Sequence, residues 1–357
     1  MSANSESAPA RLEQGLRSAL AAHPEWSHVA LEALADRGLA HVHIRLVGTG
    51  LLARVPKQSQ VGLGPQANLV HQAACFERAE GSRHTPRLIG ALPVSDQLPR
   101  GALLVEEIAG RHARIPSDLA AIAAALGAVH ALPLPATRAR APLSSCPDPL
   151  RSLLGEVDAQ AKHLPGAGLD PAVVRLLQEE LETLRRLADG AARPGVQLIA
   201  FDAHPGNFIL RPDGSAFLVD LEKCRYSHPG LDLAHATLYT STTWDVDASA
   251  VLRLREVIDF YRRWELAVGA GIAVAAGPWH VPLRRAMWLW SITWCCQWRA
   301  VSHCPPQPPG AGQDWSVDNS DADLVAHVRE RVDHYLSLAV IERVRQELHA
   351  LRGALTG

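Results

Sequence analysis

The chain has few cysteines and few aromatic residues, no long apolar run and no excess of either charge. Only six cysteines occur in 357 residues and no two are spaced as CxxC, so neither a disulfide framework nor a ribbon-type zinc site is indicated. The 35 basic and 37 acidic residues form no long run of either sign, which gives no footprint for nucleic acid or an anionic membrane. A small molecule is therefore the expected partner, and the oligomeric state is left open.

The densest apolar stretch, from Ala286 to Cys296, is too short to span a bilayer. The polar N-terminal residues have no basic start followed by an apolar core, so they are not typical of a secretory signal. Together with the sparse cysteines, these features predict a cytoplasmic protein. Cys295, Cys296, His303 and Cys304 crowd together, but adjacent cysteines point in different directions on a helix, which disfavours a metal site there.

Hydrophobic periodicity predicts a first lobe over residues 1–108. Its expected elements are leading helices over 10–22 and 29–35, a helix over 67–79, and strands over 41–46, 51–55, 86–90 and 102–105. The first two strands form a hairpin because the residues between them include Gly48-Thr49-Gly50, where glycine permits positive φ. The lobe is thus expected to be built mainly on antiparallel pairing.

Residues 109–357 change to mainly helical spacing and predict a second, larger lobe. Expected helices cover 117–132, with Ser117 as the N-cap, 149–163 and 170–188, and helices dominate again after 231. One β-prone island over 198–219 interrupts them, and Asp213-Gly214 within it is the two-residue signal for a tight hairpin. The expected fold class is therefore α+β and bilobal.

Three polar residues lie at the ends of apolar strands within this island: Asp202, Asn207 and Asp220. Phosphoryl transfer from ATP needs a carboxylate that orients and deprotonates the acceptor hydroxyl, and oxygen ligands that hold Mg²⁺ against the phosphates. The hairpin returns Asn207 and Asp220 to the same end of one ribbon. These residues therefore predict a catalytic base at Asp202 and Mg²⁺ ligands at Asn207 and Asp220.

Three ordered segments of the chain resemble motifs of the aminoglycoside phosphotransferase and choline kinase family, and the likeness extends over about residues 39–239. The segments are Asp202-Ala203-His204-Pro205-Gly206-Asn207, Val219-Asp220-Leu221-Glu222 and Gly230-Leu231-Asp232-Leu233-Ala234. The resemblance implies a protein-kinase-like fold and the same roles for Asp202, Asn207 and Asp220. It also implies that Asp232 caps a helix and braces the catalytic loop.

Residues beside these motifs are expected to support the site rather than react. His204 is expected to hydrogen-bond to backbone within the loop, because the aspartate two residues earlier already serves as the base. Glu222 and Lys223 are expected at the surface or behind the reacting groups.

The resemblance also indicates where a nucleotide would bind. Backbone groups around Glu106, Glu107 and Ile108 would hold the edge of the adenine, as the hinge does in this fold. The loop Val47-Gly48-Thr49-Gly50 would cover the phosphates with its exposed N–H groups. The choice between ATP and GTP is left open.

By the same resemblance, the strand cation that pairs with the α- and β-phosphates falls at Arg54. Lys57 is the rival for this role, although Pro56 is expected to end the strand before it. Arginine keeps the charge of the usual lysine but presents a planar fork to phosphate. Its glutamate partner is in doubt, because Gln72 occupies the expected helix position and Glu77 follows one and a half turns later.

The opening of the catalytic motif departs from the family pattern. Ala200-Phe201 stands where His-Gly is usual, which removes a side chain that normally steadies the loop. Two alternatives to an active kinase therefore stay open: a nucleotide-binding pseudokinase without turnover, and a non-catalytic interaction protein that uses its tryptophan-rich end. The retained Asp202 favours the active enzyme.

Trp290, Trp294 and Trp298 recur at four-residue spacing on one face of an expected helix. Core packing is the ordinary reason for such a pattern, and an aromatic wall of the acceptor pocket is the second hypothesis. Few carboxylates flank this segment, so a polycationic aminoglycoside is disfavoured. The expected acceptor is a hydroxylated metabolite such as an amino alcohol.

Overall fold

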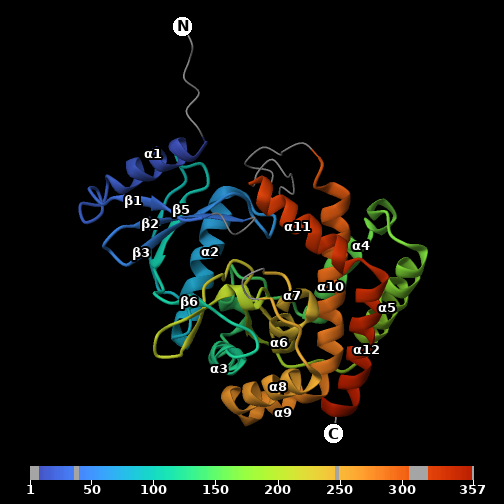
Figure 1. The fold of residues 1–357 in the computed structure, drawn as a ribbon. Coiled ribbons are helices and arrows are strands. Elements are labelled where there is room, and N and C mark those ends of the chain that lie inside the picture. Colours follow the sequence, from blue (N-terminus) through green and yellow to red (C-terminus); the bar gives the residue numbers. More distant parts are fainter. Residues whose placement is uncertain (1–7, 36–39, 246–248, 305–320, 356–357) are drawn as a thin grey trace.

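The computed structural model describes residues 8–35, 40–245, 249–304 and 321–355 (Figure 1). These residues form two lobes, a small one around an antiparallel sheet and a larger one made mainly of helices. The expected bilobal α+β fold class is confirmed.

Five antiparallel strands form the sheet of the small lobe in the order β1-β2-β3-β5-β4. They are β1 (Leu31–Ala33), β2 (His41–Leu46), β3 (Leu51–Pro56), β4 (Leu88–Leu92) and β5 (Ala102–Glu106). One helix covers each face of the sheet, α1 (Ala8–Leu20) and α2 (Pro65–Ala79) (Figure 1). Along β5, Leu104 packs into the core shared with α1, whereas Leu103 and Val105 pack into the core shared with α2, as the two-residue period of a strand requires.

The prediction of a second leading helix over 29–35 is wrong. Leu31 and Ala33 instead pair with Leu46 and Ile44 and add β1 to the edge of the sheet. A helix of two turns is marginal without tertiary support, whereas a strand placed beside β2 gains a ready-made ladder of hydrogen bonds.

The large lobe contains ten helices within the described ranges. They are α3 (Leu119–His130), α4 (Pro149–Ala161), α5 (Pro171–Asp189), α6 (Pro229–Thr237), α7 (Tyr239–Thr242), α8 (Leu254–Val268), α9 (Ala270–Ala276), α10 (His280–Val301), α11 (Ala322–Tyr335) and α12 (Leu338–Leu355). None of the helices in the described ranges is both long and apolar enough to cross a bilayer. Ser117 is not an N-cap: Asp118 precedes α3, and the Ser117 hydroxyl donates to the carbonyl of Arg114.

Two small sheets carry the β-prone island expected within the helical lobe. β6 (Arg111–His112), β8 (Phe208–Leu210) and β9 (Ala216–Leu218) form one, and β7 (Gln197–Ile199) pairs with β10 (Arg225–Ser227) in the other. The hairpin is confirmed, with φ of +83° at Gly214, but residues 211–215 connect the paired strands instead of a two-residue turn.

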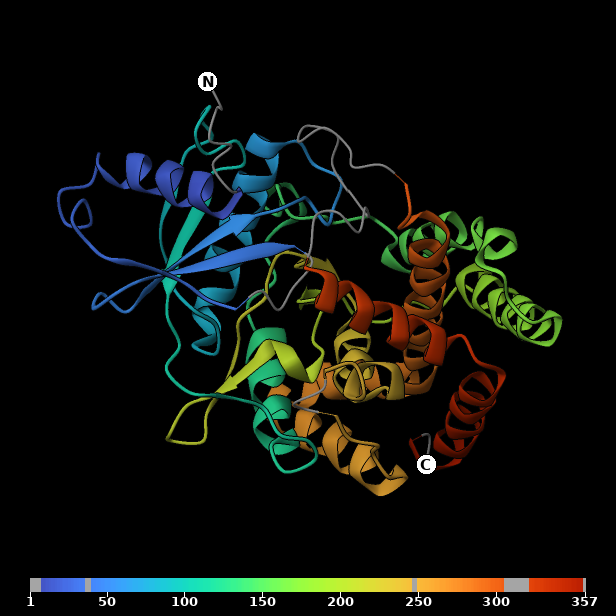
Figure 2. The ribbon, with the colours of Figure 1, turned by 45° about the horizontal axis from the view of Figure 1, so that its top comes forward.

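The long helix α10 forms the centre of the large lobe, with Trp288, Leu289 and Ile292 fully buried along it. Figures 1 and 2 both show α11 between the sheet and α10. This helix therefore closes one side of the space between the lobes.

Candidate active site

A cavity of about 1080 Å³ lies between the two lobes. Residues of β2, β3 and the end of β5 line one side, and the loops after β7 and β9 line the other. Residues of α10 and α11 line a further part of it. All three predicted reacting residues, Asp202, Asn207 and Asp220, are among the lining residues.

The β8–β9 hairpin brings Asn207 and Asp220 side by side. Phe208 pairs with Leu218, and the N–H of Val219 donates to the carbonyl of Asn207 over 2.9 Å. The amide Nδ2 of Asn207 in turn donates to the carbonyl of Asp202 over 2.8 Å. The structure thus gathers the three residues, because backbone pairing and one side-chain bond fix their relative positions.

Lys223 holds the carboxylate of Asp202. Its Nζ lies 2.7 Å from Oδ2, and the side chains of both residues are 15 % exposed. His235 on α6 lies near the other carboxylate oxygen of Asp202, with 3.7 Å between its Nδ1 and Oδ1. Burial by itself raises the pKa of Asp202, but the charge of Lys223, followed by His235, outweighs it and holds the pKa below its usual value. The carboxyl group of Asp202 is therefore ionised.

Arg54 makes the corresponding pair with Asp220. Its Nη2 donates to Oδ1 over 2.8 Å, and its Nη1 donates to the carbonyl of Val219 over 2.8 Å. Burial favours the neutral acid, but the arginine holds the pKa of Asp220 well below its usual range. Of the two rival cations, Arg54 lines the cavity, whereas Lys57 is not among the described residues that do.

The helix residue Gln72 bonds to His41 rather than to Arg54, with 3.1 Å between Oε1 and Nε2. His41 lies on β2 and is buried, and burial, followed by the charge of Arg54, lowers its pKa to about 3. A neutral imidazole therefore links α2 to the arginine, whose Nη2 lies 3.4 Å from Nδ1. Sequence reasoning missed His41 because a histidine on a strand carries no motif of its own.

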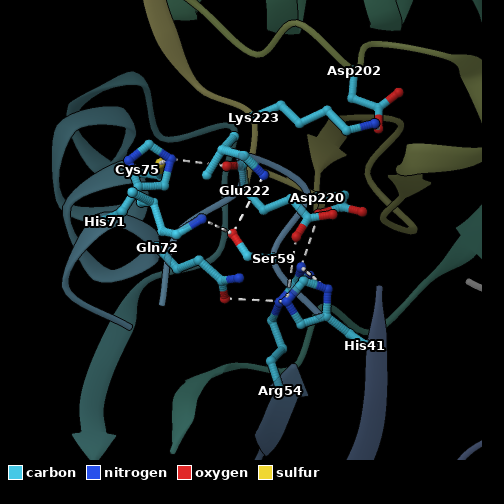
Figure 3. A network of polar contacts seen from close by, with 12 residues as sticks. His41, Arg54, Ser59, His71, Gln72, Cys75, Asp202, Asp220, Glu222 and Lys223 are labelled. Atoms are coloured by element: carbon cyan, nitrogen blue, oxygen red, sulfur yellow. Dashed lines mark hydrogen bonds and ion pairs between the residues drawn. The ribbon is translucent and has the colours of Figure 1, made fainter. Parts of the chain in front are cut away.

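Glu222 and Lys223 are not surface residues, contrary to one of the expectations. The chain turns after Asp220 so that Glu222, 3 % exposed, points inward while Lys223 extends back toward Asp202 (Figure 3). His71 on α2 donates from Nε2 to the backbone carbonyl of Glu222 over 3.0 Å. Burial, followed by the negative charge of Asp220, raises the pKa of Glu222 well above its ordinary value.

Asp232 braces the loop that carries Asp202. Its two carboxylate oxygens accept the N–H groups of Ala200 and Phe201 over 2.7 and 2.8 Å. His130 Nε2 also lies 3.1 Å from Oδ2, and this nitrogen carries the proton, because the indole N–H of Trp264 donates to Nδ1. Asp232 lies in the first turn of α6, whose N-cap is His228, so it does not cap that helix.

Within the loop, the Nδ1 of His204 accepts the N–H of Gly206 over 3.2 Å. This is the local backbone contact expected of His204. The ring also lies 6.0 Å from that of His235, between centroids, so two histidines flank the Asp202 carboxylate.

Phe201 adopts a left-handed conformation, with φ of +60°. Its buried ring packs edge-on against Trp290, 5.0 Å away between centroids, and Arg225 stacks over it at 3.7 Å. Phe201, one of the two residues that replace the usual His-Gly, thus connects the loop of Asp202 to Trp290, which lines the cavity.

The prediction that the loop Val47-Gly48-Thr49-Gly50 covers the phosphates is wrong. The turn Gly48-Thr49-Gly50 joins β2 to β3 at the hinge end, where the N–H of Glu107 donates to the carbonyl of Gly50 over 2.8 Å, and none of its residues lines the cavity. The extra strand β1 explains this: the connection from β1 to β2 occupies the opposite end of the sheet. Leu34, Ala35 and Ala40 of that connection line the cavity; residues 36–39 lie outside the described ranges.

Glu106, Glu107 and Ile108, the residues of the predicted hinge, line the cavity. The carboxylate of Glu106 pairs with Arg211 over 2.7 Å, and that of Glu107 pairs with Arg45 over 2.8 Å. An arginine therefore engages the carboxylate of each of these two glutamates.

Trp290 and Trp294 line the cavity, but Trp298 does not. One turn further along α10, Trp298 is 4 % exposed and packs into the helical core with Leu164 and Ala167, because α10 runs on beyond the cavity. Sequence reasoning missed several other residues that line the cavity with Trp290 and Trp294. They come from separate segments: Ser241, Trp244, Asp245, His327 and Tyr335.

The cysteine-rich segment is not among the described residues whose potential metal-ligand atoms gather within 4.8 Å of one another. Cys295 and Cys296 are buried, and burial raises the pKa of Cys296 to about 12. Among the described residues, the one group of possible ligands that gathers is His41, Asp220 and Glu222, with ligand atoms within 4.8 Å of one another.

A sequence profile of the phosphotransferase enzyme family (APH) matches residues 65–267, which is more than half of the chain. The chain belongs to this family. A comparison with the sequences of curated proteins finds no match.

Solved structures of small-molecule kinases share the fold of this phosphotransferase-family chain. A choline/ethanolamine kinase family protein from Mesorhizobium loti is 18 % identical, with a TM-score of 0.60 over 96 % of this chain and 99 % of that one. Ethanolamine kinase from Plasmodium vivax is 12 % identical, with a TM-score of 0.58 over 90 % and 86 %. Aminoglycoside 2′-phosphotransferase-IIIa, solved as a GDP complex, is 14 % identical, with a TM-score of 0.58 over 90 % and 98 %. The protein-kinase-like fold implied by the motifs is confirmed.

Proposed function

We propose that this phosphotransferase-family protein transfers the γ-phosphoryl group of ATP to a hydroxyl of a small molecule, with Mg²⁺ as cofactor. One observation carries the proposal: Asp202, Asn207 and Asp220 meet on one side of a cavity large enough for a nucleotide and an acceptor together. The family membership and the kinase fold support the same reaction class.

The donor set fits Mg²⁺. Because Asn207 donates its Nδ2 to the carbonyl of Asp202, its amide oxygen is the atom that can bind a cation. Asp220 supplies an ionised carboxylate, since Arg54 depresses its pKa. Hard oxygen ligands of this kind suit Mg²⁺, which neutralises charge on the phosphates when bound.

Asp202 would accept the proton of the acceptor hydroxyl. As the hydroxyl oxygen bonds to the γ-phosphorus, the bond from that phosphorus to the β,γ-bridging oxygen breaks and ADP leaves. The bond between Asn207 Nδ2 and the carbonyl of Asp202 and the brace from Asp232 keep the base beside the metal ligands. The chain's contribution is then mainly positioning and charge stabilisation.

The nucleotide base would lie against the backbone of Glu106, Glu107 and Ile108, at the end of the cavity opposite the aromatic residues of α10. The solved GDP complex of aminoglycoside 2′-phosphotransferase-IIIa supports nucleotide binding in this fold. We place the enzyme in the cytoplasm, where ATP and Mg²⁺ are available.

The acceptor would occupy the aromatic end of the cavity. Trp244, Trp290, Trp294 and Tyr335 line it, and Trp244 and Trp294 meet edge to face at 5.9 Å between centroids. Aromatic faces attract organic cations, and Asp245 adds one carboxylate. An amino alcohol fits this lining better than a polycation, and the choline and ethanolamine kinases of the same fold support that class.

The experiment is thermal unfolding with and without Mg²⁺ and ATP, for wild type and for Asp220→Ala. A ligand at a hundred times its Kd stabilises the folded state by about 2.7 kcal/mol, so wild type should shift and Asp220→Ala should not. Hydroxylated amines are then screened for ADP release, with Asp202→Asn as the inactive control. Binding without any ADP release would indicate a pseudokinase, and no shift at millimolar nucleotide would overturn the proposal.

A further inference from the structure

Lys223 places a positive charge, partly shielded from solvent, beside the cavity at a position where the family motif does not predict one. A turn after Asp220, in which the N–H of Cys224 donates to the carbonyl of Leu221 over 2.9 Å, directs the lysine back across the site. Its side chain points to Asp202 and away from Arg54 and His41 (Figure 3). The side chain of Lys223 is 15 % exposed, and the residue lines the cavity.

A lysine inside a protein can have a purely structural role. The pair formed by Arg284 and Glu347 is an example of a buried charge in such a role. All three nitrogens of the Arg284 guanidinium donate, to the carboxylate of Glu347 and to the hydroxyl and carbonyl of Thr237. A charge buried for stability has its donors satisfied in this way, because unsatisfied donors are costly.

Lys223 differs from this pattern. An ammonium group has three donors, and within the described residues the Nζ of Lys223 makes one hydrogen bond, to Asp202. Because Lys223 lines the cavity, its remaining donors are available to a ligand bound there. Burial lowers and the charge of Asp202 raises its pKa, and the net direction is upward, so the group is charged.

The other Lys and Arg side chains that line the cavity are engaged elsewhere. Among the described residues these are Arg45 and Arg54. Arg45 donates to Glu32 and Glu107 at the hinge end. Arg54 donates to Asp220 and to the carbonyl of Val219. Lys223 is thus the cation beside the base that still has donors to offer.

We propose that Lys223 is a catalytic residue that hydrogen-bonds to the phosphoryl group during its transfer; this inference rests on the proposed function. The hydroxyl held by Asp202 bonds to the γ-phosphorus, so the oxygens of that group come close to any donor in contact with the Asp202 carboxylate. Lysine reaches them by a small rotation of its flexible four-carbon stem. Lys223 keeps its proton throughout and stabilises the charge on the transferred oxygens.

The experiment measures nucleotide binding without turnover. Dissociation constants of Mg²⁺ complexes of ADP and of the non-hydrolysable analogue adenosine 5′-(β,γ-imido)triphosphate are determined for wild type and Lys223→Gln. We expect Lys223→Gln to weaken the analogue about tenfold or more, as for a charge-assisted hydrogen bond, and to change the Kd of ADP less than threefold. Lys223→Arg should recover most of the difference, because it keeps the charge.

Equal weakening of both nucleotides, or of neither, would overturn the role of Lys223. If wild type binds neither nucleotide, the proposed function fails as well, so the two failures are distinguishable. Should Lys223→Gln not fold because it leaves Asp202 unpaired, the double variant Asp202→Asn/Lys223→Gln is compared with Asp202→Asn. Arg185→Gln removes an exposed ion pair with Asp158 and serves as the matched control, for which both Kd values should stay unchanged.

Discussion

Arg54 and Asp220 join the two lobes through one ion pair, with 2.8 Å between Nη2 and Oδ1 across a sequence separation of 166 residues. Arg54 is 4 % exposed and belongs to β3 of the small lobe, whereas Asp220 follows β9 in the large lobe. The pair therefore connects a proposed metal ligand of the large lobe directly to the small lobe.

Two replacements of Arg54 should distinguish the contribution of its charge to stability from that of its guanidinium geometry. Arg54→Ala leaves the carboxylate of Asp220 without its partner and should cost about 3 kcal/mol, the low end for a buried pair because the Asp220 side chain is 25 % exposed. Arg54→Lys keeps the charge but loses the second donor to Val219, and should cost about 1 kcal/mol. Urea unfolding measures both free energies, and equal losses for the two variants would contradict the charge argument.

At Phe201, glycine should be tolerated better than alanine. Both substitutions remove the buried ring, at about 3–5 kcal/mol. Alanine keeps a Cβ at a φ of +60°, whereas glycine has no left-handed penalty, so Phe201→Gly should be more stable than Phe201→Ala by up to about 1 kcal/mol. Thermal and urea unfolding of the two proteins test this order, and a more stable alanine variant would show that the left-handed conformation stores no strain.

Removing the carboxylate of Asp232 should destabilise the loop that carries Asp202. Asp232→Ala leaves the N–H groups of Ala200 and Phe201 without acceptors, and each buried unsatisfied donor costs about 1–3 kcal/mol. We expect a loss of at least about 3 kcal/mol in the free energy of unfolding. Asp259→Ala removes an exposed i,i+4 pair with Arg263 and should change stability by less than about 0.5 kcal/mol. Similar losses for the two variants would be inconsistent with the brace.

The buried His235 should make stability fall as the pH is lowered. Burial, opposed by Asp202, lowers its pKa to about 4, against about 6.5 in an unfolded chain. Between these values the unfolded chain binds a proton that the folded protein excludes. Stability should therefore decrease from about pH 6.5 to about pH 4, with this residue contributing up to about 1.4 kcal/mol per pH unit.

Free energies of unfolding at pH 7, 6 and 5 measure this slope. His235→Asn should reduce it, because asparagine does not titrate. An unchanged slope in the variant would mean that other groups account for the acid sensitivity.

The hairpin that holds Asn207 and Asp220 could be predicted because its determinants are local. Apolar runs on each side of Asp213-Gly214 mark both strands, although the observed pairing of Leu210 with Ala216 differs by one residue from the register of a two-residue turn. The helices α2, α4 and α5 were predicted to within a few residues for the same reason, since each has a periodic apolar face.

Long-range contacts decided the features that sequence reasoning missed. Residues 29–35 have helical spacing, yet they form β1 because β2 offers an open edge, and that change moves the Gly48-Thr49-Gly50 turn to the hinge end. Trp298 shares its spacing with Trp290 and Trp294 but lies beyond the end of the cavity. Spacing within one element carries no information about where the neighbouring elements end.

Short-range periodicity and turn residues act on neighbouring positions, so they suffice to predict the fold class and the order of Asp202, Asn207 and Asp220. Which charges face one another depends instead on long-range packing. Arg54 meets Asp220 and Lys223 meets Asp202 because burial makes an unpaired charge costly. The partner that satisfies each charge is chosen by the packing of the two lobes, which no local pattern encodes.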